Sequence, residues 1–93
     1  MTEISIKYYN LAADFMGKKV EKRDLPDRAT CLDLVVMLAD ENERFRKLAL
    51  NSDGKIGNRL RIFRNGKITF KLDEELAQGD EIIIFPAVSG GSA

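Results

Sequence analysis

The chain of 93 residues carries two adjacent glycines near its C-terminus, Gly90 and Gly91, which are followed by Ser92 and Ala93. Glycine has no Cβ, so such a segment is thin and pliant and can enter a narrow channel. A Gly-Gly pair at the free end of a small domain suits a carboxylate that is handed to another enzyme. Because Ser92 and Ala93 follow the pair, the Gly91 carboxyl carbon still stands in a peptide bond.

An apolar strand must position this tail. Residues 81–85 include three consecutive isoleucines and Phe85, and Pro86 follows them. Four apolar residues in succession predict a central strand that is covered on both faces. We therefore assign residues 1–88 to one domain and residues 89–93 to a tail that we expect to be flexible. When extended, residues 88–91 span at most about 13 Å, which would carry a terminus into a buried site.

The N-terminal part of the chain predicts a hairpin. Ile4, Ile6 and Tyr8 alternate with mostly polar residues, and this period of two indicates a strand with one buried face. A short connection containing Gly17 leads to residues 18–25, whose many charges suit an edge strand. Two apolar pairs are expected to pack in or over the core: Tyr8 with Tyr9, and Phe15 with Met16.

The main helix is predicted to begin at Cys31. Thr30 has the character of an N-cap, and Asp33 stands at capping-box spacing from it. The following apolar residues recur at helical spacing: Leu32, Val35, Val36 and Ala39, with Leu34 and Leu38 widening the stripe. The helix is expected to end near residues 40–42. Residues 43–50 predict a short second helix with Phe45 and Leu48 facing the core.

The second half of the chain predicts a loop and then strands. Turn-forming residues fill positions 51–58, which indicates a surface loop. Residues 59–64 predict a strand with Leu60 and Ile62 on one face, and Asn65-Gly66 is a strong hairpin signal. Residues 67–70 are expected to return as a short strand. Leu72 and Leu76 lie four positions apart and predict a single helical turn, with Asp73 as its cap.

The predicted order is therefore β-β-α-β-β-β. The first and last strands are the most apolar, so we expect them at the centre of the sheet. Because a helix lies between them, they can pair in parallel. This order resembles the ubiquitin-like roll, a β-grasp of the α+β class, with a mixed sheet of about five strands and one main helix.

Composition narrows the classes of function. Lys plus Arg and Asp plus Glu both total 15, so no net charge favours a nucleic-acid or membrane partner. The single cysteine cannot form an internal disulfide, and histidine is absent, so a transition-metal site is not expected. No apolar run approaches the roughly 18 residues of a spanning helix, and no signal-peptide pattern opens the chain. We therefore expect a cytoplasmic protein.

Nearly the whole chain resembles the MoaD/ThiS group of ubiquitin-like sulfur carriers, in particular the small subunit of molybdopterin synthase and the small archaeal modifiers. The residues that carry this resemblance are Val20–Leu25 with the helix opened by Thr30, the 64–66 hairpin, and the segments 76–82 and 85–91. Members of the group usually end at the second glycine, so Ser92 and Ala93 are a departure from the pattern.

The resemblance implies a function for the tail. An E1-like enzyme that uses ATP would adenylate the carboxylate of Gly91, and a sulfur donor would convert it to a thiocarboxylate. Val88, Ser89 and Gly90 would thread the partner's channel. The large subunit of molybdopterin synthase would then take the sulfur in molybdopterin (Mo/W cofactor) biosynthesis. The chain itself would bind no cofactor and would be a carrier rather than an enzyme.

Two other functions remain open. The chain could be a ubiquitin-like modifier whose activated carboxylate is joined to lysines of target proteins. It could also be a plain interaction module with an inert tail. Ser92 and Ala93 allow three explanations: a pro-tail removed by a protease, such as the JAMM-type metalloproteases that process some relatives; a linker remnant; or loss of the carrier function.

A few other residues are candidates for partner docking or for reactivity. Phe63, Phe85, Pro86 and Arg61 could form a docking surface on the sheet, although the phenylalanines equally suit the core. Arg59, Arg61 and Arg64 lie near one strand, and a solvated, edge-protecting role is slightly favoured for them. Cys31 stands in the first turn of a helix, where its thiol could be activated, but a buried core role is favoured.

Overall fold

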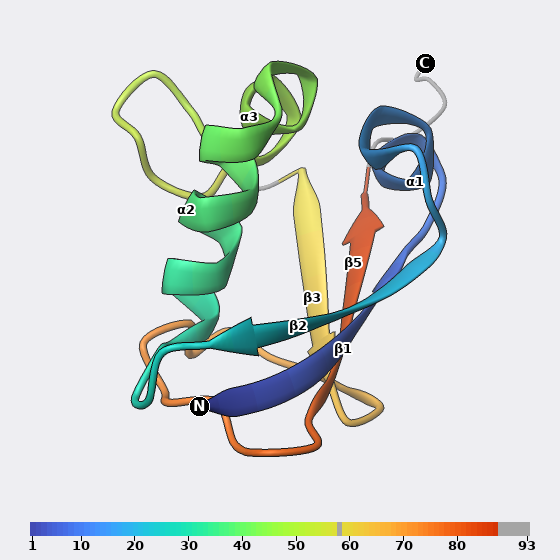
Figure 1. Cartoon of the computed structure of the whole chain (residues 1–93). Helices are drawn as coiled ribbons and strands as arrows, with labels where there is room; N and C mark the ends of the chain where they lie inside the picture. The colour runs from blue at the N-terminus through green and yellow to red at the C-terminus, as the bar shows by residue number, and fades with distance from the viewer. Residues whose placement is uncertain (58, 88–93) are drawn as a thin grey trace.

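The computed structural model describes residues 1–57 and 59–87, so Val88 and the predicted tail, residues 89–93, lie outside the described residues. The chain forms a mixed sheet with helices on one side of it (Figure 1). In chain order the elements are β1 (Thr2–Tyr8), α1 (Leu11–Met16), β2 (Val20–Leu25), α2 (Cys31–Glu41), α3 (Glu43–Ala49), β3 (Leu60–Arg64), β4 (Lys67–Ile68) and β5 (Glu81–Pro86).

The sheet has five strands in the order β2-β1-β5-β3-β4. β1 and β5 run parallel, with Ile6 opposite Ile82, and all other neighbours are antiparallel. The first and last strands are thus central, and the charged strand β2 lies at one edge. These three predictions and the β-grasp class are confirmed.

Only one face of the sheet is covered by helices, and the core lies between them (Figure 1). Along β5, Ile82 and Ile84 are fully buried, whereas Ile83 is half-buried and Phe85 is 36% exposed. The prediction that this strand is covered on both faces is therefore wrong. A run of isoleucines does not distinguish a strand buried on both faces from one whose outer face is apolar for another reason.

The capping box of α2 is confirmed. The Asp33 N–H donates to Thr30 Oγ1 at 3.1 Å, and the Thr30 N–H donates to Asp33 Oδ2 at 2.9 Å. Such a cap stabilises a helix by about 1 kcal/mol. The inward face differs from the prediction, because Leu32 and Val36 are exposed. The buried residues of this helix are Cys31, Leu34, Val35, Leu38 and Ala39.

The segment 72–76 forms no helical turn, contrary to the prediction. The Leu32 N–H donates to the carbonyl of Leu72 at 2.8 Å, and the Leu76 N–H donates to the carbonyl of Ala29 at 2.8 Å. The first N–H groups of a helix have no partner within the helix. The segment supplies one such partner at the start of α2, and its first residues form a hydrogen-bonded turn rather than a helix, in which the Glu74 N–H donates to the carbonyl of Lys71 at 3.4 Å.

The connection between β1 and β2 also differs from the prediction, because it contains the short helix α1. Six residues are too few for an apolar period to stand out. Within this helix only Ala12 is buried, and the helix ends at Gly17, whose φ of 74° is left-handed. Tyr9, expected over the core, is 43% exposed.

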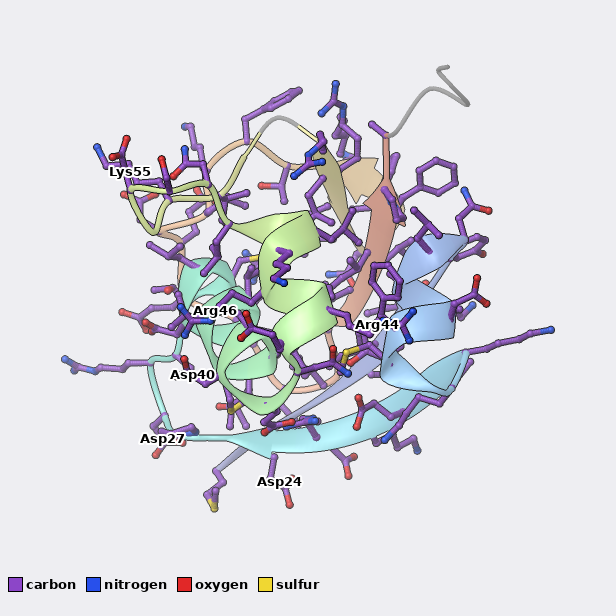
Figure 2. All side chains as sticks on the ribbon, turned by 90° about the horizontal axis from the view of Figure 1, so that it is seen from above. Asp24, Asp27, Asp40, Arg44, Arg46 and Lys55 are labelled. Carbon is purple, nitrogen blue, oxygen red and sulfur yellow. The ribbon has the colours of Figure 1, made fainter. Side chains whose placement is uncertain are left out.

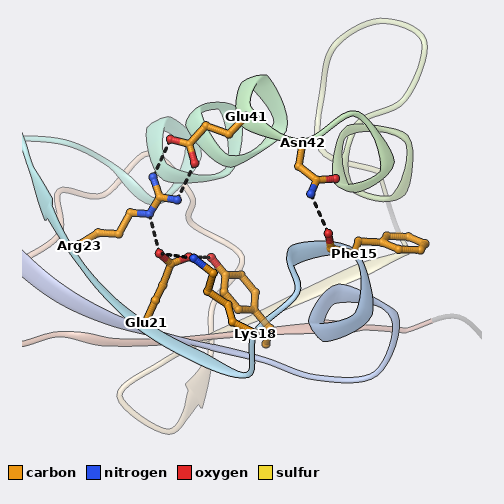
Figure 3. Close-up of polar contacts among 7 residues, drawn as sticks. Phe15, Lys18, Glu21, Arg23, Glu41 and Asn42 are labelled. Atoms are coloured by element: carbon orange, nitrogen blue, oxygen red, sulfur yellow. Dashed lines mark hydrogen bonds and ion pairs between the residues drawn. The ribbon is translucent and has the colours of Figure 1, made fainter.

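Polar side chains join the helices to one another and to the edge strand. Arg46 of α3 pairs with Asp40 of α2 at 2.7 Å (Figure 2). Arg23 of β2 donates through both terminal nitrogens to the carboxylate of Glu41, at 2.6 and 2.5 Å, and through Nε to Glu21 at 3.1 Å (Figure 3). These contacts hold α2 over the edge of the sheet.

The hairpin predicted at Asn65-Gly66 is present, and its φ values of 52° and 86° are both positive, as a type I′ turn requires. The returning strand β4 is shorter than expected, because it ends at Ile68 rather than at Phe70. The side chain of Asn65 reaches across to the first residue of β5, where its Oδ1 accepts from the Glu81 N–H at 2.9 Å.

Asp80 is the one charged side chain that is buried among the described residues. Its carboxylate accepts from Arg64 Nε at 2.9 Å, from Asn65 Nδ2 at 2.9 Å and from the Ala77 N–H at 2.7 Å. Burial alone would raise the pKa of Asp80. The Ala77 N–H, the Asn65 amide and the Arg64 guanidinium outweigh burial and lower this pKa below its ordinary value.

Asp80→Asn should lower the free energy of unfolding by about 2 kcal/mol at neutral pH, because Arg64 and two N–H donors lose a charged acceptor. A lowered pKa in the folded state stabilises the fold above the unfolded-state pKa, 3.8. This contribution disappears as the pH falls through the folded-state pKa. Urea denaturation across the acid range should therefore show the difference from the unsubstituted protein shrinking on acidification. Asp73→Asn, on an exposed turn, is the matched control, and an equal loss in both variants would contradict the assignment.

Candidate functional site

The end of β5 provides a fixed root for the tail. Pro86 stands opposite Leu60 of β3, and the next residue continues the ladder, because the Ala87 N–H donates to the carbonyl of Arg59 at 2.7 Å. The backbone is therefore held in the sheet up to the last described residue. The tail residues to which the chemistry was assigned lie outside the described part: Val88, Ser89, Gly90, Gly91, Ser92 and Ala93.

Beside this root, the uncovered face of the sheet carries an apolar patch, which we call the open-face patch: Tyr9, Phe63, Ile68, Ile83 and Phe85. The sheet register brings its members together, because Phe63 stands opposite both Ile83 and Ile68. The rings of Tyr9 and Phe85 lie 5.7 Å apart between centroids, at an interplanar angle of 37°. Ile68 and Tyr9 are 41% and 43% exposed.

Charged side chains border the open-face patch. Arg61 stands opposite Phe85, and Lys7 stands opposite Ile83. The Nζ of Lys7 pairs with a carboxylate oxygen of Glu81 at 3.3 Å, across the two central strands. An exposed apolar patch with a polar rim is typical of a protein docking surface. Its position at the end of β5 places a docked partner beside the start of the tail.

The four predicted docking residues do not all lie on the same face of the sheet, because side chains alternate between the two faces along a strand. Phe63, Phe85 and Arg61 lie on the open face, as a docking role requires. Pro86 lies on the other face and is buried, so the docking role assigned to it is wrong. It shares this face of β5 with the core residues Ile82 and Ile84.

Sequence reasoning missed Tyr9, Ile68 and Ile83 as members of the open-face patch. The parity of the strands could have identified Ile83, since it lies two residues from Phe85 and therefore on the same face. Arg64 was considered for docking, but it is engaged with Asp80, at 2.8 Å from Nη2 to Oδ2. It therefore supports the fold rather than the surface.

Cys31 is a core residue, which confirms the interpretation favoured from the sequence. Its side chain is 2% exposed, and burial raises the pKa of the thiol to about 11 despite the opposing charge of Arg64. The alternative, a thiol activated by the helix N-terminus, does not fit this environment.

Within residues 1–57 and 59–87, no group of three or more His, Cys, Asp or Glu side chains is arranged to hold a metal ion. In the same part of the chain, none of the helices has the length and apolar character needed to cross a membrane.

The sequence model of the ThiS family matches residues 6–91. The chain belongs to the ThiS family. It is 30% identical over 79 residues to small archaeal modifier protein 1 of Haloferax volcanii, a match that covers 85% of this chain and 90% of the relative. The family match and this relative agree with the resemblance that the tail, hairpin and strand motifs indicate.

Solved structures agree on the fold. The crystal structure of SAMP1 from Haloferax volcanii superposes with a TM-score of 0.84 at 28% identity, covering 96% of this chain and 99% of that one. A putative molybdopterin converting factor, subunit 1, from Pyrococcus furiosus superposes with a TM-score of 0.77 at 26% identity, covering 95% and 100%. This ThiS-family chain therefore has the ubiquitin-like β-grasp fold, and its relatives include both modifier and molybdopterin-related proteins.

The thiol of Cys31 should react slowly with a thiol reagent at neutral pH while the protein is folded, and rapidly once urea unfolds it. The physical reason is that burial removes access and keeps the thiol protonated. Timed alkylation followed by mass measurement checks this. Equal rates in the folded and unfolded protein would contradict the core assignment.

Proposed function

We propose that this protein is a sulfur carrier that donates sulfur in molybdopterin (Mo/W cofactor) biosynthesis from a thiocarboxylate at Gly91. The observation that carries the proposal is that the ThiS family match ends at Gly91 and leaves Ser92 and Ala93 outside it. The ladder bond at Ala87 supports it, because a tail delivered to an enzyme needs a fixed root. The molybdopterin-related relative from Pyrococcus furiosus favours this pathway.

The chemistry takes place on enzymes other than this chain. A carboxylate oxygen of Gly91 attacks the α-phosphorus of ATP on an E1-like enzyme, and pyrophosphate leaves. A sulfur nucleophile at the oxidation level of sulfide, hydrosulfide, then attacks the carbonyl carbon of the resulting acyl adenylate, a C–S bond forms, and AMP leaves. The product is the thiocarboxylate, which the large subunit of molybdopterin synthase would receive. The chain contributes the terminus and the docking surface, and it works in the cytoplasm.

The peptide bond between Gly91 and Ser92 must be hydrolysed before this chemistry can begin. A protease of the JAMM metalloprotease type is the proposed agent. Intact-mass measurement of the protein from its native cell tests this step, since processing removes both Ser92 and Ala93. An unprocessed mass in cells that make the cofactor would contradict the carrier function.

A second candidate function is conjugation to other proteins. The 30% identity to small archaeal modifier protein 1 favours it. In this case the Nζ of a target lysine, rather than a sulfur nucleophile, attacks the activated carbonyl carbon of Gly91, and an isopeptide bond forms. Isopeptide-linked remnants of this chain that end at Gly91, such as the segment 72–91 after trypsin cleavage at Lys71, would identify this function on lysines of other proteins. A thiocarboxylate identifies the first function.

Gly91→Val in the Gly91-terminated protein should block adenylation while leaving the melting temperature nearly unchanged. A branched side chain widens the tail and restricts its φ and ψ. The Gly91-terminated protein and the variant are each incubated with ATP and the E1-like enzyme of the source cell, and the mass of the C-terminus is followed. Adenylation of the variant at the normal rate would contradict the threading mechanism. If the unsubstituted protein does not react either, the result would favour an inert tail.

Phe85→Ser should weaken binding to the E1-like enzyme by about tenfold, because the ring is a central and exposed member of the open-face patch. Surface-plasmon resonance with the immobilised enzyme measures the change. Phe70→Ser is the matched control, since Phe70 is 79% exposed but lies outside the open-face patch. Equal affinity of the two variants would contradict docking through this face.

A further inference from the structure

A basic hollow lies on the helical side of the molecule, at the same end as the root of the tail. It has a volume of about 450 Å³ and is lined by three apolar residues and three cations: Leu11, Phe15, Leu48, Arg44, Lys47 and Arg59. These residues come from α1, from α3 and from the position before β3. Figure 1 shows α1, α3 and the end of β5 at the same end of the molecule.

The walls of the basic hollow are held in place by Asn42. Its Oδ1 caps α3 by accepting from the Phe45 N–H at 2.9 Å, and its Nδ2 donates to the carbonyl of Phe15 at 2.7 Å (Figure 3). One side chain thus fixes the distance between α1 and α3. Between these helices, Arg44 places its guanidinium carbon 4.9 Å from the centre of the Phe15 ring (Figure 2).

The cations of the basic hollow have no carboxylate partner in the part of the chain that the structure describes. Arg44, Lys47 and Arg59 form no ion pair there, although Arg46 on the same helix pairs with Asp40. The guanidinium of Arg59 donates to a neutral group, from Nη2 to the carbonyl of Lys47 at 3.0 Å. The chain as a whole has no net charge, so the positive charge here is a local excess.

We propose that the basic hollow binds an acidic segment, carrying an aliphatic or aromatic side chain, of the enzyme that acts on the tail. The side chain would enter between Leu11, which is 40% exposed, and the floor formed by Leu48. Carboxylates of the same segment would pair with the three cations, which gives charge complementarity. Leu11 and Leu48 are aliphatic, and the Phe15 ring is already in contact with the Arg44 guanidinium. The hollow therefore suits a peptide side chain better than a stacked nucleotide base.

The position of the basic hollow gives this binding a role. Arg59 lines the hollow, and its carbonyl accepts from the Ala87 N–H at 2.7 Å. A segment bound in the basic hollow would therefore lie next to the end of β5, from which the tail begins. That the partner is an enzyme of the tail rests on the proposed function, whereas the binding of an acidic segment does not.

The test uses the full chain labelled with ¹⁵N and two peptides that are acetylated at the N-terminus and amidated at the C-terminus. They are Glu-Asp-Leu-Phe-Glu-Asp and its uncharged analogue Gln-Asn-Leu-Phe-Gln-Asn. The acidic peptide should shift the amide signals of α1 and α3 and bind about tenfold more tightly than the analogue. Replacing the three cations together, by R44E, K47E and R59E, should abolish the difference. The combination K19E, K55E and K71E, which changes exposed lysines elsewhere, should preserve it.

Three outcomes would overturn the proposal: no shifts with the acidic peptide, equal loss of binding in both triple variants, or displacement of the peptide by AMP at lower concentration. The milder triple variant R44Q, K47Q and R59Q, with a melting curve for each protein, separates lost binding from lost folding. Neither ATP nor an activating enzyme is present, so the result is independent of any reaction at Gly91.

Discussion

The arrangement of the sheet depends on the hydrogen bonds that the buried carboxylate of Asp80 accepts. Asp80 ties the β3–β4 turn, through Arg64 and Asn65, to the segment that precedes β5. Its own backbone extends the connection, because the Ser5 N–H of β1 donates to the Asp80 carbonyl at 3.0 Å. One residue therefore aligns β5 with both of its neighbours at the point where the strand begins.

That alignment decides which side chains face the core and which face a partner. Side chains alternate along a strand, so a slip of one residue would exchange the two sets. In the observed register Ile82 and Ile84 complete the core, while Ile83 and Phe85 contribute to the open-face patch. The same short strand thus holds the molecule together, presents a surface and ends at the root of the tail.

The alternation of β1, the capping box at Thr30 and the turn at Asn65-Gly66 are local signals, and the structure follows each of them. Misses occurred where a distant partner decides the outcome. The segment 72–76 contains a turn rather than a helix, and the Leu32 N–H of α2 donates to its Leu72 carbonyl. The outer face of β5 is uncovered because no helix of the described residues crosses it.

The candidate site also combines features that a local sequence signal indicates with features that depend on residues distant in the chain. The Gly-Gly tail is visible in the sequence itself, and its role stays a prediction because it lies outside the described residues. The open-face patch depends on pairing between strands far apart in the chain. Pro86 could not be assigned from type, since a proline suits a surface or a core equally. The basic hollow draws on residues from three separate elements, and no spacing in the sequence relates them.

The parallel pairing of β1 with β5 joins the first residues of the chain to the last described ones. Bringing the two strands together lowers the entropy of the long intervening chain, and contacts between neighbouring residues do not offset this loss. The pairing of β1 with β5 therefore depends on the folding of the elements between them. A partly unfolded chain would possess the glycines of the tail but neither the aligned aromatic residues nor the fixed root. Under the proposed function, an enzyme that recognises both features would use ATP only on folded molecules, so the topology would restrict activation to the native state.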